Sequence, residues 1–175
     1  MTIRNLLLTF SLFSCLLASA QQANQRTYCE NEAFNKKVHK VLSHTVTPIS
    51  VEELHQHFDS HTLLDTRELD EYLVSHIPGA IHFGYDNPKF DVLDDLPKDT
   101  KIVLYCSIGY RSEKMGEKLE KQGFTNIKNL YGSIFEWANQ DFPVVNPQKI
   151  ETKRVHTYNK RWSKWVDNET VEKIY

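Results

Sequence analysis

Cys106 stands in a segment whose residue types could perform thiolate chemistry. Residues 106–112 read Cys-Ser-Ile-Gly-Tyr-Arg-Ser and lie between a predicted strand and a predicted helix. A tight turn between two such elements directs backbone N–H groups inward, and with the start of the helix they form an anion-binding cradle. A cysteine in this cradle has a lowered pKa and exists partly as the nucleophilic thiolate. Gly109 permits the close turn, and Arg111 adds a fixed cation for an anionic substrate.

A second interpretation of Cys106 is purely structural. A free cysteine often behaves as a small buried hydrophobe, and a cysteine that ends a strand is a common example. Taken alone, Cys106 fits this interpretation better. The presence of Gly109 and Arg111 at these offsets favours the functional interpretation.

The elements around Cys106 alternate between strand and helix. Residues 101–105 are almost continuously apolar, as a central strand of a parallel sheet must be. The alternation predicts a parallel sheet with helices on both faces, and ligands of such sheets bind beyond the carboxyl ends of the strands, where Cys106 lies. The other predicted strands are 48–50, 62–65, 80–83 and 126–131, and the predicted helices are 28–43, 50–58 with Ser50 as its cap, 68–74, 112–122 and 133–139.

Two stretches of the chain resemble the rhodanese domain family. The first runs from residue 64 to 81 and contains Leu-Asp-Thr-Arg-Glu and His-Ile-Pro-Gly-Ala-Ile; the second runs from 105 to 137 and contains the cysteine segment. The resemblance covers about residues 48–145. It implies an α/β sandwich with a central parallel five-stranded sheet flanked by helices. It also implies sulfur transfer through a persulfide on Cys106, with no metal or organic cofactor.

The resemblance also implies roles for the rest of residues 106–111, which we call the cysteine loop. Cys106 and Arg111 are its catalytic residues, and the residues between them form the substrate-binding loop: Ser107, Ile108, Gly109 and Tyr110. The six-residue length matches sulfurtransferases, whereas related phosphatases have one residue more, so a cysteine-dependent phosphatase or arsenate reductase is disfavoured. A non-catalytic module that binds a protein partner is the main alternative, and the retained Cys106 argues against it.

The donor and acceptor are left open by the loop sequence. Ser107 replaces the basic residue that often stands second in thiosulfate-using members, which weakens the case for thiosulfate and leaves polysulfide or persulfide donors open. The expected acceptor is cyanide, a small thiol or a protein thiol.

A net charge of −2 excludes a strongly basic nucleic-acid-binding protein. His55 and His57 are two residues apart and do not converge on a helix, so no metal site is predicted.

Asp65 and Arg67 are expected to support the site rather than react. Asp65 ends a predicted strand and Arg67 opens the next helix, so the pair suits a partly buried ion pair that holds the loops. A catalytic base at Asp65 is the alternative.

The N-terminus has the pattern of a secretory signal peptide over residues 1–20. Arg4 precedes the apolar stretch 6–17, and Ala-Ser-Ala at 18–20 predicts cleavage before Gln21. We therefore expect a periplasmic or secreted protein. The alternatives are a buried N-terminal helix, an uncleaved anchor, and a lipoprotein modified at Cys15.

Two extensions flank the predicted domain. Residues 21–47 include the first helix and Cys29, expected to be a half-buried thiol or else a disulfide or resolving partner of Cys106. Residues 146–175 contain Trp162 and Trp165 among basic residues. A strand and a helix packed on the domain edge are expected there, and an aromatic and basic surface for a partner or membrane is the alternative.

Overall fold

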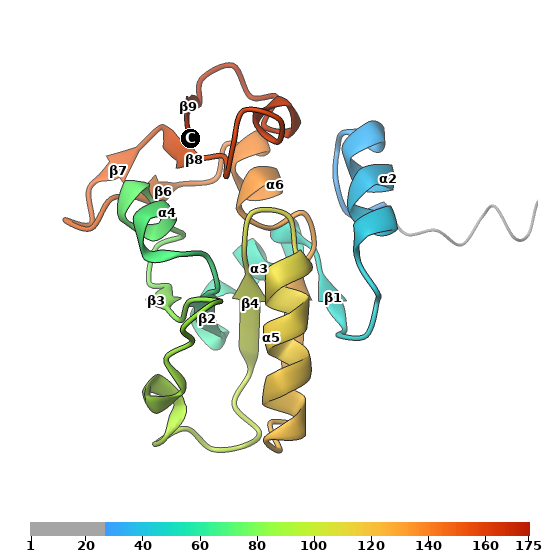
Figure 1. The fold of residues 1–175 in the computed structure, drawn as a ribbon, viewed down its shortest axis with the longest axis vertical. Helices are drawn as coiled ribbons and strands as arrows, with labels where there is room; N and C mark the ends of the chain where they lie inside the picture. Colours follow the sequence, from blue (N-terminus) through green and yellow to red (C-terminus); the bar gives the residue numbers. More distant parts are fainter. Residues whose placement is uncertain (1–26) are drawn as a thin grey trace, which may run out of the picture.

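A five-stranded parallel sheet forms the centre of the computed structural model, which describes residues 27–175 (Figure 1). Its order is β1-β5-β4-β2-β3. The strands are β1 (Pro48–Ile49), β2 (Thr62–Asp65), β3 (Ile81–His82), β4 (Ile102–Tyr105) and β5 (Ile127–Leu130). Every residue of β4 is buried, as its apolar sequence requires in the middle of a sheet covered on both faces. The predicted sandwich with a five-stranded parallel sheet is therefore confirmed.

Two hydrophobic clusters cover the two faces of the sheet. One contains Val103 and Tyr105 of β4 together with side chains of α2 (Glu32–Val41), α3 (Val51–Gln56) and α6 (Ser133–Asn139). The other contains Ile102 and Leu104 with side chains of α5 (Tyr110–Lys121) and the 3-10 helix η2 (Phe90–Leu93). Alternate residues of β4 thus point to opposite faces. The short helix α4 (Leu69–Val74) follows β2, and the 3-10 turn η1 (Phe58–Ser60) follows α3.

Helix α5 begins two residues earlier than predicted. Gly109 is its N-cap residue with φ of 117°, a left-handed conformation that side chains disfavour. The chain therefore turns into the helix directly after Gly109. Tyr110 and Arg111 lie in the first helical turn and not in the preceding loop, which corrects the predicted extent of the substrate-binding loop.

The first helix is shorter than residues 28–43. Asn31 caps α2 by accepting a hydrogen bond from the Phe34 N–H at 3.0 Å, and the helix ends at Val41. The predicted signal peptide and Cys15 lie outside the described residues. Within residues 27–175, no helix is long and apolar enough to cross a membrane.

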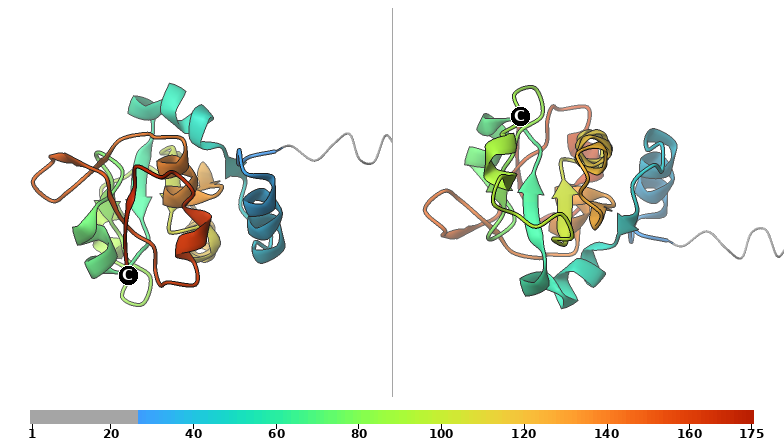
Figure 2. Two further views of the ribbon diagram at one scale, coloured as in Figure 1. Left: turned by 90° about the horizontal axis from the view of Figure 1, so that it is seen from above. Right: turned by 90° about the horizontal axis from the view of Figure 1, so that it is seen from below.

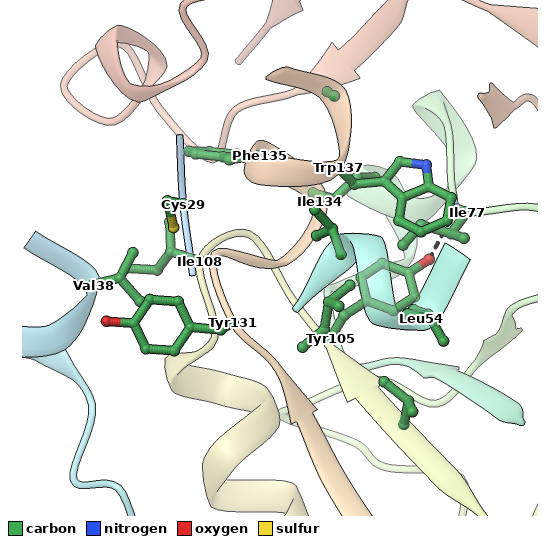
Figure 3. Packing of buried hydrophobic residues seen from close by; sticks show 14 of the residues in the cluster. Cys29, Val38, Leu54, Ile77, Tyr105, Ile108, Tyr131, Ile134, Phe135 and Trp137 are labelled. Carbon is green, nitrogen blue, oxygen red and sulfur yellow. Dashed lines mark hydrogen bonds between the residues drawn. The ribbon is translucent and has the colours of Figure 1, made fainter. Parts of the chain in front are cut away.

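Cys29 is a fully buried free thiol, not a half-buried one. It is 1% exposed and belongs to the same cluster as Val38 and Ile108 (Figure 3). Burial and the neighbouring Glu136 raise the pKa of this thiol far above its ordinary value. Cys29 and Cys106 are both unbridged, so the disulfide alternative is not realised in this structure.

The C-terminal segment crosses the edge of the sheet at which the strands end (Figures 1 and 2). β6 (Val144–Val145) pairs with β7 (Glu151–Thr152), and β8 (Arg154–His156) pairs in parallel with β9 (Glu172–Ile174). Between β8 and β9 lies the 3-10 helix η3 (Ser163–Trp165). The segment does pack on the domain, but it contains a single 3-10 turn where an α-helix was expected.

The two indoles of this segment face the domain. Trp165 stacks on Phe34 of α2 with ring centroids 5.6 Å apart, and Trp162 packs against the same cluster. Aromatic rings gain more from this burial than from exposure to water. This packing agrees with the expected attachment of the segment to the domain edge, while the alternative of an aromatic and basic surface for a partner or membrane stays a prediction.

Candidate active site

Cys106 lies directly after β4, at the carboxyl end of the most buried strand. Its side chain is recessed, because the residue is only 2% exposed. The Cys106 Sγ accepts a hydrogen bond from the Gly109 N–H at 3.1 Å. The left-handed conformation of Gly109 directs this N–H back toward the sulfur, which is the role that the sequence assigned to the glycine.

The cysteine loop is held in place by two neighbouring elements. The N–H groups at the start of α6 donate to its carbonyl groups, from Ile134 to Cys106 at 3.2 Å and from Phe135 to Ser107 at 3.2 Å. In β5, the Asn129 side-chain amide donates to the Gly109 carbonyl at 3.0 Å. These contacts from the protein itself hold the loop in position, as pre-organised electrostatic stabilisation requires.

The environment of Cys106 favours the thiolate. Burial raises the pKa of the thiol, but the positive charge of Arg111 and the N–H groups of the surrounding loop outweigh burial, so the pKa lies below its ordinary value. The N–H groups that contribute are those of Ser112, Gly109 and Ile108. The structure thus brings Cys106 and Arg111 together across the turn that leads from β4 into α5.

Arg111 is paired with Glu71, a residue that the sequence analysis did not select. Its guanidinium donates to the two carboxylate oxygens of Glu71 at 2.6 and 2.8 Å and to the Ser107 hydroxyl at 3.1 Å. Burial raises the pKa of Glu71, but the ion pair with Arg111 outweighs it and holds the pKa below its ordinary value. Glu71 lies 40 residues from Arg111, and its sequence signal was its place within the first family stretch, residues 64–81, as an acidic residue in the first turn of a short helix.

Asp65 and Arg67 form a completely buried ion pair, since both side chains are 0% exposed. The Arg67 guanidinium donates to both carboxylate oxygens of Asp65, at distances from 2.6 to 3.1 Å, and also to the Ser75 carbonyl at 2.7 Å. The pair ties the end of β2 to the residue after α4. This arrangement fits the supporting role, with more complete burial than the sequence predicted, and leaves no free oxygen of Asp65 to act as a base.

A cavity of about 590 Å³ opens above Cys106. The cysteine loop contributes Cys106, Ser107, Ile108, Tyr110 and Arg111 to its lining. The remaining lining residues come from four other segments: Val41, Glu68, Tyr85, Asp86, Tyr158 and Trp162. Sequence reasoning placed Trp162 in the C-terminal extension and gave Tyr158 no role, because nothing in the local pattern says that this extension reaches the cysteine loop.

We expect Cys106 to react as a thiolate at lower pH than a free thiol. The rate of alkylation by iodoacetamide, followed against pH, should have its midpoint below about 8.5, the value for an unperturbed cysteine. Because Arg111 and the loop N–H groups favour deprotonation, the alkylation rate should rise with pH and reach its plateau at a lower pH than for a free thiol. Cys29 is buried with a raised pKa and should stay unmodified in the native protein. A midpoint for Cys106 at or above the free-thiol value would contradict the electrostatic role of the loop.

The family model of the rhodanese-like domain matches residues 50–140, which include β2, β4, the cysteine loop and α5. The chain belongs to the rhodanese-like domain family. Cys106 and Arg111 of this rhodanese-like domain lie within the matched region, whereas Val41, Tyr158 and Trp162 of the cavity lie outside it.

Relatives with curated names include sulfurtransferases. The chain is 30% identical over 99 residues to a putative sulfur carrier protein, YrkF, of Bacillus subtilis, covering 55% of this chain and 53% of that one. It is 27% identical over 123 residues to the adenylyltransferase and sulfurtransferase UBA4 of Candida albicans, covering 66% of this chain and 27% of the relative. The chain thus spans about a quarter to a half of the length of these relatives.

Solved structures show the same fold. A thiosulfate sulfurtransferase from Pseudomonas aeruginosa matches with a TM-score of 0.53 and 23% identity, over 59% of this chain and 21% of that one. The BH2092 protein from Bacillus halodurans matches with a TM-score of 0.52 and 24% identity, over 66% of this chain and 85% of that one. At these identities the likeness concerns the arrangement of the sheet and helices.

Proposed function

We propose that this rhodanese-like domain is an active sulfurtransferase in which Cys106 carries the transferred sulfur as a persulfide. The observation that carries the proposal is the recessed Cys106 sulfur, which accepts the Gly109 N–H at 3.1 Å at the base of an open cavity. A purely structural cysteine needs neither the cavity nor the convergent N–H groups. The relatives named as sulfurtransferases support the same reaction class.

The reaction follows as a double displacement at sulfur. The Cys106 thiolate attacks the outer sulfur of a donor R–S–SH; the new S–S bond forms as the donor S–S bond breaks, and R–S⁻ leaves with the electron pair and takes up a proton. An acceptor nucleophile, cyanide or a thiolate, then attacks the outer sulfur of the Cys106 persulfide. The Cys106 thiolate is the leaving group of this second step, so the enzyme returns to its starting state without an external oxidant or reductant.

The cysteine loop stabilises the charges that these steps create. The N–H groups of Ile108, Gly109 and Ser112 surround the sulfur that is anionic before attack and again after transfer. The charge of Arg111 favours the same thiolate, while the Ser107 hydroxyl and Glu71 hold its guanidinium in position. The lowered pKa of Cys106 increases the fraction present as thiolate before the first step. It also makes this thiolate a better leaving group in the second step.

Intact-mass measurement tests the proposal directly. The purified chain is incubated with thiosulfate and, separately, with an organic hydropersulfide, and then mapped by peptide mass spectrometry. We expect one added sulfur atom on Cys106 and its release as thiocyanate when cyanide is added. If no donor places sulfur on Cys106, the transferase proposal is overturned and a non-catalytic binding module takes its place.

We further propose that the chain is exported and that its mature form begins at Gln21. The support is the sequence pattern of residues 1–20, an apolar stretch after Arg4 followed by Ala-Ser-Ala. N-terminal sequencing of the protein from its native host should find Gln21 as the first residue, within the periplasm or the medium. A chain that starts at Met1, or a lipid on Cys15, would contradict the proposal.

A further inference from the structure

The C-terminal segment forms part of the cavity wall above Cys106. Tyr158 and Trp162 both line the cavity, although they lie beyond the residues 50–140 that define the family match. They follow β8 and precede η3, so they lie on the connection that crosses the sheet edge in Figure 1. This part of the wall therefore lies outside the residues that the family model matches.

The segment is fixed to the rest of the domain. The buried Thr157 donates through its N–H to the Ile174 carbonyl at 2.7 Å, which closes the β8–β9 pair. Asn139 of α6 donates to the Trp165 carbonyl at 2.9 Å and accepts from the Asp167 N–H at 2.9 Å. His156 Nδ1 lies 3.8 Å from the Glu71 carboxylate. Because these anchors lie on both sides of Tyr158 and Trp162, they hold the stretch of backbone that carries both rings beside the cavity.

Arg111 is poorly placed to bind a free anion. Its guanidinium is 13% exposed, makes two hydrogen bonds to Glu71, and has the Tyr158 ring 5.3 Å from its central carbon. The carboxylate neutralises its charge, and the phenol ring covers one of its faces. What remains of the Arg111 charge acts on the adjacent Cys106 sulfur.

The other charges in the cavity wall are negative. Apart from Arg111, the ionised side chains among the lining residues are Glu68 and Asp86. A small inorganic dianion that approaches Cys106 passes these carboxylates and meets no unpaired cation among the lining residues. Half of the remaining lining residues are aromatic: Tyr85, Tyr110, Tyr158 and Trp162. Such rings favour apolar carbon and cationic groups.

We propose that Tyr158 and Trp162, together with Glu68 and Asp86, select the sulfur donor. The donor is a small organic hydropersulfide whose organic group is uncharged or positively charged, in preference to thiosulfate. Its carbon chain lies against the two rings of the C-terminal segment, and its terminal sulfur reaches the recessed Cys106. The inference rests on the proposed sulfur transfer, and it adds the substrate class and the residues that set it.

A charge series of donors with one carbon skeleton tests the electrostatic part. The 2-aminoethyl, 2-hydroxyethyl and 2-carboxyethyl hydropersulfides and thiosulfate are compared by the second-order rate of sulfur loading on Cys106. We expect the 2-aminoethyl donor to load Cys106 about tenfold faster than the 2-carboxyethyl donor, because Glu68 and Asp86 should each contribute roughly two- to fivefold. Thiosulfate should load most slowly. In the Glu68→Gln/Asp86→Asn variant this ratio should fall toward one. Asp95→Asn removes an exposed carboxylate that does not line the cavity, and it should leave the ratio unchanged.

The aromatic wall is tested with an apolar donor. Benzyl hydropersulfide should load Cys106 about tenfold more slowly in Tyr158→Ala or Trp162→Ala, since a lost aromatic contact of about 1.4 kcal/mol is a factor of ten, whereas thiosulfate loading should not fall. Tyr175→Ala, which removes a tail aromatic that is 61% exposed and does not line the cavity, is the matched control. Tyr158 is 53% exposed, so its replacement tests the wall even if Trp162→Ala unfolds.

The outcomes separate this inference from the proposed function. Thiosulfate loading that equals or exceeds that of the organic donors, or a charge ratio that Glu68→Gln/Asp86→Asn does not change, would overturn the selection by the cavity wall while leaving sulfur transfer in place. No loading of Cys106 by any donor would overturn the transferase itself.

Discussion

Replacement of Cys106 by serine is expected to abolish sulfur transfer while the fold stays intact. A serine hydroxyl is not ionised at neutral pH and cannot form a persulfide, so kcat should fall by at least on the order of 10³-fold. The fold should tolerate the change because the hydroxyl can still accept the Gly109 N–H that Cys106 Sγ accepts at 3.1 Å. We expect the free energy of unfolding to change by about 1 kcal/mol or less.

The other cysteine of the described residues provides the matched control. Cys29→Ala removes a thiol that is 1% exposed, belongs to the core cluster that includes side chains of α2 and α6, and does not itself line the cavity. This variant should keep its rate of transfer from an organic hydropersulfide to cyanide, with some loss of melting temperature from the small cavity. If sulfur transfer persists in Cys106→Ser and disappears in Cys29→Ala, Cys29 is the reacting thiol, and the site described above is contradicted.

Replacement of Arg111 by alanine is expected to damage both reactivity and stability. The cation favours the Cys106 thiolate, and a charge-assisted contact of this kind contributes about 1.5–3 kcal/mol, or roughly 10- to 150-fold in kcat/KM. The same change leaves Glu71, whose side chain is 3% exposed, without its partner. An unpaired buried charge costs about 3–5 kcal/mol, so the melting temperature should fall clearly.

The carboxylates of Glu113 and Asp65 are not the partners of Arg111. Glu113 accepts from the N–H groups of Ser43 and Thr45, and Asp65 is paired with Arg67. The partner is Glu71, and the pair makes Arg111 both a clamp and a source of charge for Cys106.

A second substitution separates the two roles of Arg111. In Arg111→Ala/Glu71→Gln no buried charge is left unpaired, so we expect stability to recover while the alkylation midpoint of Cys106 stays raised. Arg111→Lys should recover part of the rate, because a point charge lacks the fork that grips Glu71. If Arg111→Ala lowered the melting temperature but the folded enzyme kept the parental kcat/KM and Cys106 midpoint, Arg111 would be a clamp alone.

Local sequence was sufficient for the sheet and for the position of the nucleophile. The apolar run that forms β4, the cap of α3 by Ser50 and the left-handed Gly109 each depend on a few adjacent residues. Because parallel strands end at one edge, the cysteine after β4 had to lie at that edge. The start of α5 was misplaced by two residues because Tyr110 and Arg111 have no feature that distinguishes a loop from a first helical turn.

The environment of the nucleophile was decided by tertiary structure. Glu71 reaches Arg111 across 40 residues, and Asn129 reaches Gly109 across 20, so neither contact has a signal in local spacing. The C-terminal segment is the strongest example, since Tyr158 and Trp162 lie in the connection between the paired strands β8 and β9 and line the cavity together with the cysteine loop. Spacing along the chain reports which residues share a face of one element. Which distant elements then meet is set by packing of the whole core, and it is this packing that placed two aromatic rings and two carboxylates above Cys106.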